Sequence, residues 1–143
     1  MGVVAKFLDA SSFQSFSDAL LPKCLDAIKH VLADPEAQSE ERLAVTENAF
    51  ITLGFLSLLH SKDQAQISQF LEVLPLQGDE EAQEAHEFLF EQILLGNAAL
   101  FSEPIASKVK QALEKIHAAR TEDNLSDEGV EKMMQAVEKM KTL

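Results

Sequence analysis

The most constraining feature of the chain is a series of short amphipathic segments, separated by breaks that contain Pro, Gly or Asp. In the first segment, apolar side chains recur from Phe13 to Val31 at the intervals of a helical face. No useful stretch alternates apolar and polar residues, so we expect no β-sheet. We expect helices over residues 22–32, 39–60, 64–74 and 80–95, a fifth that opens at Ser102-Glu103-Pro104, and a sixth after Ser126.

Residues that favour helix ends mark the limits of these segments. Pro22 suits a first helical turn, and Asp34-Pro35 ends the first helix because Pro disfavours helical backbone in the residue before it. Gly96-Asn97 is the expected stop of helix 80–95. The expected N-caps, whose hydroxyl oxygens can accept from backbone N–H groups of the first turn, are Ser39, Ser102 and Ser126.

The helices group into three successive pairs. The second members begin near Glu40, Glu80 and Asp127, a spacing of about 40 to 47 residues, which is the period of HEAT and armadillo repeats. A compact helix bundle with uneven loops fits the same periodicity equally well, because three repeats is the minimum for a repeat array. The sequence therefore predicts an all-α fold and leaves these two architectures open.

The charge balance narrows the classes of partner. The chain of 143 residues carries 24 acidic and 12 basic groups, a net charge of −12. Such a surface repels phosphate backbones and anionic membranes, so we expect no direct nucleic-acid binding, no membrane association and a preference for basic partners. No apolar stretch approaches the length needed to cross a bilayer, and no signal peptide is visible. The single cysteine, Cys24, excludes an intrachain disulfide and favours a reducing compartment.

Several segments, taken in order, resemble one family. The run 45–54, VTENAFITLG, pairs Asn-Ala with a following apolar-Gly pair. The run 70–82, FLEVLPLQGDEEA, joins Leu-Pro-Leu to an acidic turn and Glu-Ala, and the aromatic and leucine-rich helix 86–95 follows it. With the closing Leu-Ser-Asp-Glu at 125–128, the chain from Phe13 onward resembles the late HEAT repeats of karyopherin-β (importin-β-like) nuclear transport receptors.

The resemblance implies a right-handed α-α superhelix of about three HEAT-type hairpins. Its repeats would cover residues 13–60, 64–95 and 103–141, behind a leader over residues 1–12 that covers the N-terminal end. It further implies a C-terminal fragment of a transport receptor, present in cytoplasm and nucleus, that binds protein cargo with basic segments and nucleoporins. A complete site for the small GTPase Ran is not expected, since the family binds Ran through early repeats. The alternative is a free-standing helical adaptor or regulatory domain unrelated to transport.

Candidate cargo-binding residues lie on the helix over 80–95. Their carboxylates stand at spacings that place them along one helical face, opposite an apolar stripe. The four candidates are Glu80, Glu84, Glu87 and Glu91, and the apolar stripe comprises Ala82, Ala85, Leu89 and Ile93. If this helix lines the concave wall, as the resemblance implies, the four carboxylates can pair with Lys and Arg side chains of an import signal. A solvated helix face is the competing interpretation.

Asn48 and Thr52 are two further candidates. They stand one turn apart on the helix over 39–60, where their polar groups can hydrogen-bond an extended cargo backbone. The same groups can equally satisfy neighbouring loops.

Catalysis and cofactors have no support in the sequence. The histidines His30, His60, His86 and His117 form no His-Glu-x-x-His pattern, and we expect each near a helix end or at the surface, without a metal. Residues 124–135 match a calcium loop at the glycine but lack its final Glu. No nucleophile elbow, dinucleotide or phosphate-binding loop is present, so we expect a binding protein and no enzyme. Cys24 and the methionines at 133, 134 and 140 are expected to fill the core, and an adaptable partner surface is the alternative for the methionines.

Overall fold

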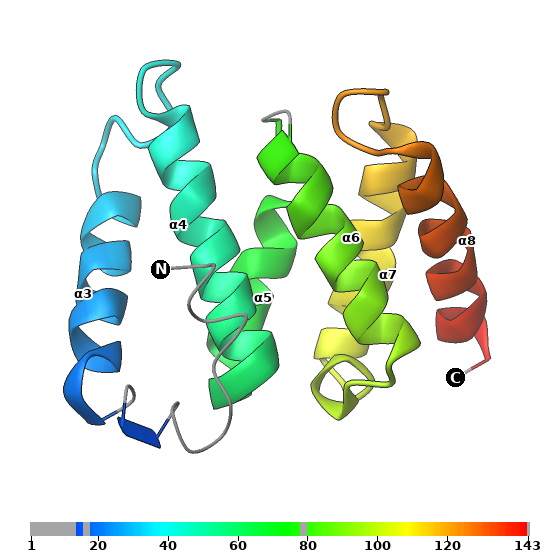
Figure 1. The fold of residues 1–143 in the computed structure, drawn as a ribbon, viewed down its shortest axis with the longest axis horizontal. Coiled ribbons are helices and arrows are strands. Elements are labelled where there is room, and N and C mark those ends of the chain that lie inside the picture. The colour runs from blue at the N-terminus through cyan, green and yellow to red at the C-terminus, as the bar shows by residue number, and fades with distance from the viewer. Residues whose placement is uncertain (1–13, 16–17, 78–79, 143) are drawn as a thin grey trace. The chain divides into compact units, whose positions relative to one another are not determined.

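The secondary structure is helical. The computed structural model describes residues 14–15, 18–77 and 80–142, and no strand occurs within these ranges (Figure 1). The prediction of an all-α fold is therefore confirmed. The elements are α3 (Leu21–Leu32), α4 (Leu43–Leu56), the π-helical turn η1 (Ser57–Ser61), α5 (Gln64–Val73), α6 (Glu80–Leu94), the 3₁₀ turn η2 (Ala98–Leu100), α7 (Ile105–Ala118) and α8 (Asp127–Lys141).

The chain divides into two units, an N-terminal unit of residues 1–67 and a C-terminal unit of residues 68–143. The division falls within α5, so it crosses the repeat predicted over residues 64–95. The predicted leader over residues 1–12 lies outside the described residues.

In the N-terminal unit, α3 packs against α4, and the two helices run in opposite directions (Figure 1). α3 has Pro22 in its first turn, as predicted. Ile28 is its one fully buried residue, and Cys24 is half-buried rather than enclosed in the core. The loop after α3 is fastened by an ion pair of 2.8 Å between the Arg42 guanidinium and the Asp34 carboxylate.

α4 and η1 form one helical segment of 19 residues, Leu43–Ser61, with a mean hydropathy of 1.3. By length and composition this segment could cross a bilayer, so the prediction that no stretch approaches that length is wrong. Core helices of folded proteins pass the same test, and 56% of its apolar window is buried. Lys62, in the left-handed region with φ of 55°, ends the segment.

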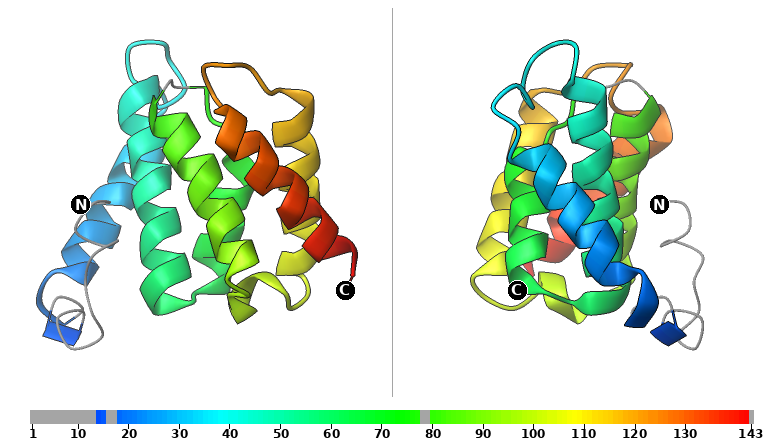
Figure 2. Two further views of the ribbon diagram at one scale, coloured as in Figure 1. Left: turned by 45° about the vertical axis from the view of Figure 1, so that its right-hand side comes forward. Right: turned by 90° about the vertical axis from the view of Figure 1, so that its left-hand side faces the viewer.

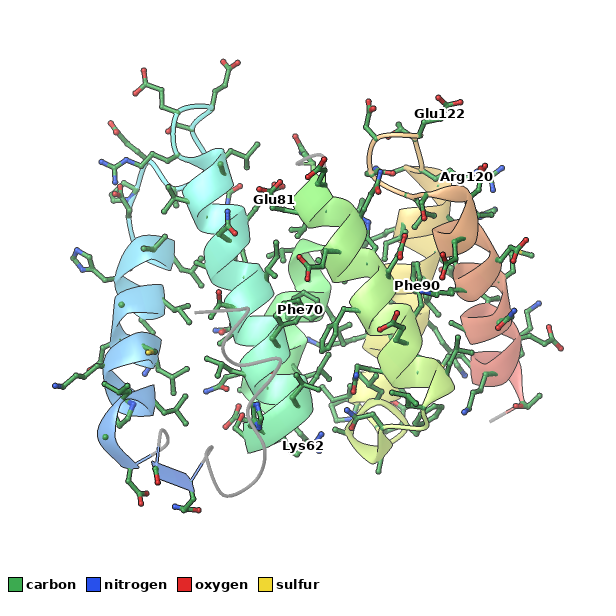
Figure 3. The ribbon with its side chains drawn as sticks, viewed as in Figure 1. Lys62, Phe70, Glu81, Phe90, Arg120 and Glu122 are labelled. Carbon is green, nitrogen blue, oxygen red and sulfur yellow. The ribbon has the colours of Figure 1, made fainter. Side chains whose placement is uncertain are left out.

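In the C-terminal unit, α8 packs beside α6 and against α7 (Figures 1 and 2). Phe70 of α5 and Phe90 of α6 are both 0% exposed (Figure 3). The burial of large apolar side chains such as these is the main stabilising contribution to a folded unit. The apolar stripe of α7 is buried throughout: Ile105, Val109, Ala112, Leu113 and Ile116.

His86 joins two loops of the C-terminal unit from inside. Its side chain is 0% exposed, so the expectation that it lies near a helix end or at the surface is wrong. Nε2 accepts a hydrogen bond of 3.1 Å from the Leu76 N–H, which requires the ring proton on Nδ1. That Nδ1–H then donates to the Asn124 carbonyl oxygen at 2.9 Å. The imidazole is therefore neutral and ties the α5–α6 loop to the α7–α8 loop.

Two helix ends follow the sequence prediction. The Ser126 hydroxyl accepts from the Gly129 N–H at 2.9 Å and is the N-cap of α8. Gly96 follows the last turn of α6 with φ of 76°, a left-handed backbone that glycine adopts without steric cost. Local chemistry therefore determines both of these ends.

The N-caps predicted at Ser39 and Ser102 are wrong. The Ser39 carbonyl accepts from the Arg42 N–H at 3.0 Å, a turn that delays the helix, and α4 begins only after Arg42. α7 begins after Pro104, which has no side chain able to cap, while Ser102 contributes only its carbonyl, to the Ala106 N–H at 3.1 Å.

Candidate protein-binding site

The side chains of α6 divide as the sequence predicts. The apolar positions Ala82, Ala85, Leu89 and Ile93 are each 0% exposed. The candidate glutamates lie away from this buried stripe: Glu80 and Glu84 are exposed, whereas Glu87 and Glu91 are partly covered. Cargo binding itself stays a prediction for all four residues.

Glu87 and Glu91 face α8 and are paired within the protein. The Lys132 ammonium lies 3.0 Å from Oε1 of Glu91 and 3.8 Å from Oε2 of Glu87, and 3.0 Å from Oε1 of Glu128. The Ser126 hydroxyl also donates to Glu87. Hydrogen bonds to Glu128 and then Glu91 raise the pKa of Lys132 above its ordinary value. Glu87 and Glu91, the C-terminal half of the predicted row of glutamates, are thus part of the α6–α8 contact.

Gly129 lies directly against this contact. A Cβ atom at this position would lie 2.8 Å from Oε1 of Glu87 and 2.8 Å from Cδ1 of Leu125. Since real Cβ contacts are not that short, any other residue here would require the ends of these two side chains to move aside, and Glu87 would shift away from Ser126 and Lys132.

Glu80 and Glu84 lie at the other end of α6, beside the α7–α8 loop. Gln83, between them in the chain, donates its amide to the carbonyl oxygens of Glu122 at 3.1 Å and Asp123 at 2.9 Å. Figure 3 shows Glu81 of α6 and Glu122 of the loop at this same end of the C-terminal unit. The amide therefore brings two acidic segments, about 40 residues apart in sequence, to one surface.

The α7–α8 loop is held by its own side chains. Asn124 Oδ1 accepts from the Thr121 N–H at 2.8 Å, and Asn124 Nδ2 donates to the Ala119 carbonyl at 3.0 Å. With the His86 contact to the Asn124 carbonyl at 2.9 Å, the loop is fixed from both sides. Its acidic residues are consequently presented by an ordered backbone.

A hollow of about 690 Å³ opens between this loop and the start of α8. Leu125 and Val130 form its apolar part, and the carboxylates of Glu122, Asp127 and Glu131 stand around it. Its lining residues are Arg120, Thr121, Glu122, Leu125, Asp127, Val130 and Glu131, so three acidic groups face one guanidinium. We call the exposed carboxylates here and at the start of α6 the acidic end: Glu80, Glu81, Glu84, Glu122, Asp123, Asp127 and Glu131.

Sequence reasoning missed most of the acidic end. The run TEDNLSDEGVE at 121–131 carries five acidic residues, which is a visible signal, but we expected only a helix cap at Ser126 there. That the run lies beside Glu80 depends on Gln83, whose neutral side chain gives no sign of its long-range partner.

Asn48 and Thr52 lie in the N-terminal unit, on α4. Asn48 is exposed and its amide donates to the Ala44 carbonyl at 2.9 Å, and Thr52 Oγ1 donates to the Asn48 carbonyl at 2.9 Å. Both side chains bond to their own helix one turn back, and neither bonds to a neighbouring loop in these contacts. Their cargo role stays a prediction.

The methionines divide between core and surface. Met133 and Met140 are 0% and 1% exposed and fill the core as expected, whereas Met134 is 55% exposed, so the expectation that it fills the core is wrong. In the described residues, no group of three His, Cys, Asp or Glu side chains is placed to hold a metal ion.

Comparisons with known proteins add no relative. No protein-family model, no curated protein and no solved structure matches the chain. The resemblance to karyopherin-β repeats therefore depends on the sequence segments alone.

Proposed function

We propose that this chain is an all-helical protein-binding scaffold whose acidic end binds a basic segment of a partner protein. The observation that supports this proposal is the hollow at the α7–α8 loop, where Glu122, Asp127 and Glu131 face the single cation Arg120. A group of carboxylates that outnumbers the nearby cations attracts Lys and Arg side chains. The apolar part of the hollow, Leu125 and Val130, suits an apolar residue between them.

The location of the site supports rapid, salt-sensitive binding. Exposed charges act over the screening length of about 8 Å at physiological ionic strength, and a net charge of −12 adds attraction at longer range. Because the loop is fixed by Asn124 and His86, ordering it would cost little free energy on binding.

As a narrower proposal, the chain consists of C-terminal HEAT-type repeats of a nuclear transport receptor, and the basic segment is an import signal on its cargo. The all-helical secondary structure of the described residues and the resemblance of residues 70–82 support it. On this proposal the hairpins form a right-handed superhelix, and nucleoporins are further partners in a protein that shuttles between cytoplasm and nucleus.

A basic peptide tests the broader proposal. A labelled Lys- and Arg-rich peptide is titrated against the full chain at low and at physiological ionic strength, with fluorescence anisotropy as the readout. We expect saturable binding that weakens with salt, and a loss of roughly tenfold or more in affinity for the double variant Glu122→Lys and Glu131→Lys. The matched control is Glu40→Lys with Glu41→Lys, which makes the same charge change on exposed residues of the N-terminal unit.

Two outcomes count against the broader proposal: equal weakening by both double variants, which indicates only bulk charge, and the absence of binding at low salt. The narrower proposal has its own tests. A labelled full chain should accumulate at the nuclear envelope of permeabilised cells. Solution scattering should give a radius of gyration larger than the value of about 14–15 Å expected for a compact chain of this length. Exclusion from nuclei and a compact particle would favour the free-standing adaptor.

A further inference from the structure

A second surface of the C-terminal unit has the opposite character to the acidic end. Between α7 and α8 lies an apolar groove of about 490 Å³, which we call the α7–α8 groove. Leu113 of α7 and Met134, Val137 and Met140 of α8 provide its apolar lining. Met134 is 55% exposed, and it adjoins other apolar side chains of the lining, so it belongs to a contiguous apolar surface.

The rim of this groove is basic. Lys110 of α7 and Lys141 of α8 line it, together with the His117 imidazole and one acidic residue, Glu114. Lys110 makes no ion pair among the described residues. Lys141 lies 3.5 Å from Glu138, but both side chains are about two-thirds exposed or more, so the ammonium remains accessible to a second carboxylate.

The ammonium groups of the rim contrast with the charge of the chain as a whole. The net charge is −12, yet the groove is lined by Lys110 and Lys141 against the single carboxylate of Glu114. On the α5 side, α7 uses Lys108 to contact Ser68 and Glu72 within the C-terminal unit, whereas Lys110 lines the groove instead. The groove therefore offers two ammonium groups to the carboxylates of an acidic ligand.

We propose that the α7–α8 groove binds an amphipathic helix of a partner protein, with an apolar stripe in the groove and acidic side chains against Lys110 and Lys141. The volume accommodates a few apolar side chains of such a stripe, and this mode of recognition uses anchors at intervals of three and four residues. The unbranched, polarisable Met134 can adapt its shape to the anchors. This inference is independent of the proposed acidic end, which selects the opposite charge.

The experiment uses the full chain with its methionine methyl groups labelled for NMR. The probe is a helical peptide that carries Leu along one face and Glu on both flanks, with a scrambled peptide of equal composition beside it. Two of the four methionines, Met134 and Met140, line the groove. We expect their methyl signals to shift saturably with the amphipathic peptide and to stay in place with the scrambled one.

Charge reversal gives a second readout. The exposed or partly exposed rim is changed in the double variant Lys110→Glu with Lys141→Glu, and the matched control is Lys23→Glu with Lys29→Glu on exposed positions of α3. The rim variant should bind the acidic peptide roughly tenfold more weakly, and the α3 variant should bind it about as the unchanged chain does. The exposed Met134→Gln change should also weaken binding without unfolding the chain.

Three results would overturn the proposal: unmoved methyl signals at a saturating peptide concentration, equal weakening by the two double variants, or the same methyl shifts with a basic peptide. The first excludes a helix-binding groove, the second reduces the effect to bulk charge, and the third shows an unselective apolar patch. None of these results bears on binding of basic peptides at Glu122 and Glu131, so the two proposals succeed or fail separately.

Discussion

The two halves of α6 carry the same residue type at the same spacing but differ in what surrounds it. Glu87 and Glu91 lie against α8, where Lys132, 24% exposed, contacts both carboxylates. Glu80, in the N-terminal half, is exposed beside the α7–α8 loop. The difference shows that a charge stripe in a sequence does not reveal which carboxylates remain available, because the residues that cover some of them come from a later helix.

The largest expected effect on the free energy of unfolding is at His86, which ties the α5–α6 loop to the α7–α8 loop. Replacing His86 with Phe leaves the Leu76 N–H and the Asn124 carbonyl without their partners. Each unsatisfied buried group costs about 1–3 kcal/mol, so we expect the free energy of unfolding to fall by about 2–4 kcal/mol in urea titrations. The exposed His30 of α3 is the matched position, and His30→Phe should stay within about 0.5 kcal/mol. Equal effects of the two changes would contradict the bridging role of His86.

The covered half of α6 is tested at Gly129. Gly129→Ala places a methyl group 2.8 Å from Oε1 of Glu87 and from Cδ1 of Leu125. Both atoms end flexible side chains that can move aside, so the overpacking cost lies at the low end of about 1–3 kcal/mol, and the better helix propensity of Ala offsets about 0.5–1 kcal/mol of it. We expect a net loss of no more than about 1 kcal/mol in thermal or urea unfolding, and part of it should return in the double variant with Glu87→Ala. Full additivity of the two changes would show that the glycine does not serve the Glu87 contact.

Lys132 forms ion pairs with the two glutamates of the covered half of α6. Lys132→Met should lower the free energy of unfolding by about 0.5–1 kcal/mol, the range of partly exposed ion pairs. Because the folded-state pKa of Lys132 is raised, first by Glu128 and then by Glu91, this contribution is present below the ordinary lysine pKa and lost as the pH rises through the raised value. The same change leaves Glu91 unpaired, so a basic peptide should bind slightly more tightly. Unchanged stability at alkaline pH and unchanged peptide affinity would contradict this role of Lys132.

The smallest effect is expected at the ion pair between Glu72 and Lys108, whose carboxylate is largely exposed. Glu72 of α5 is 60% exposed and contacts Lys108 of α7. A hydrogen bond from Lys108, then one from Ser68, lowers the pKa of the Glu72 carboxyl, so the stability it contributes is present above the ordinary glutamate pKa and lost as the pH falls through the lowered one. An NMR titration of Glu72 should move towards the ordinary midpoint in Lys108→Met. An unmoved midpoint would show that Lys108 does not act on this carboxyl.

Local patterns predicted the local parts of the fold. The period of Ala82, Ala85, Leu89 and Ile93 identified the buried face of α6, and Gly96 identified its end, because both depend on neighbours in the same helix. The start of α4 was predicted wrongly at Ser39, because the hydrogen bond from the Arg42 N–H to the Ser39 carbonyl forms a turn there in place of the helix cap.

The candidate site was predicted only in part, because its contacts join residues far apart in sequence. Lys132 meets Glu91 from 41 positions away, and Gln83 meets Asp123 from 40. His86, which looked like a surface residue, is buried because two loops converge on it. A helical period carries no information about such partners.

Amide NMR of the full chain during titration with the basic peptide tests most directly which carboxylates bind. We expect saturable shifts at residues 80–84 and 120–131, and little change along the second half of α6. Shifts confined to the α7–α8 groove or to the N-terminal unit, or no saturable shift at low salt, would contradict binding at the acidic end.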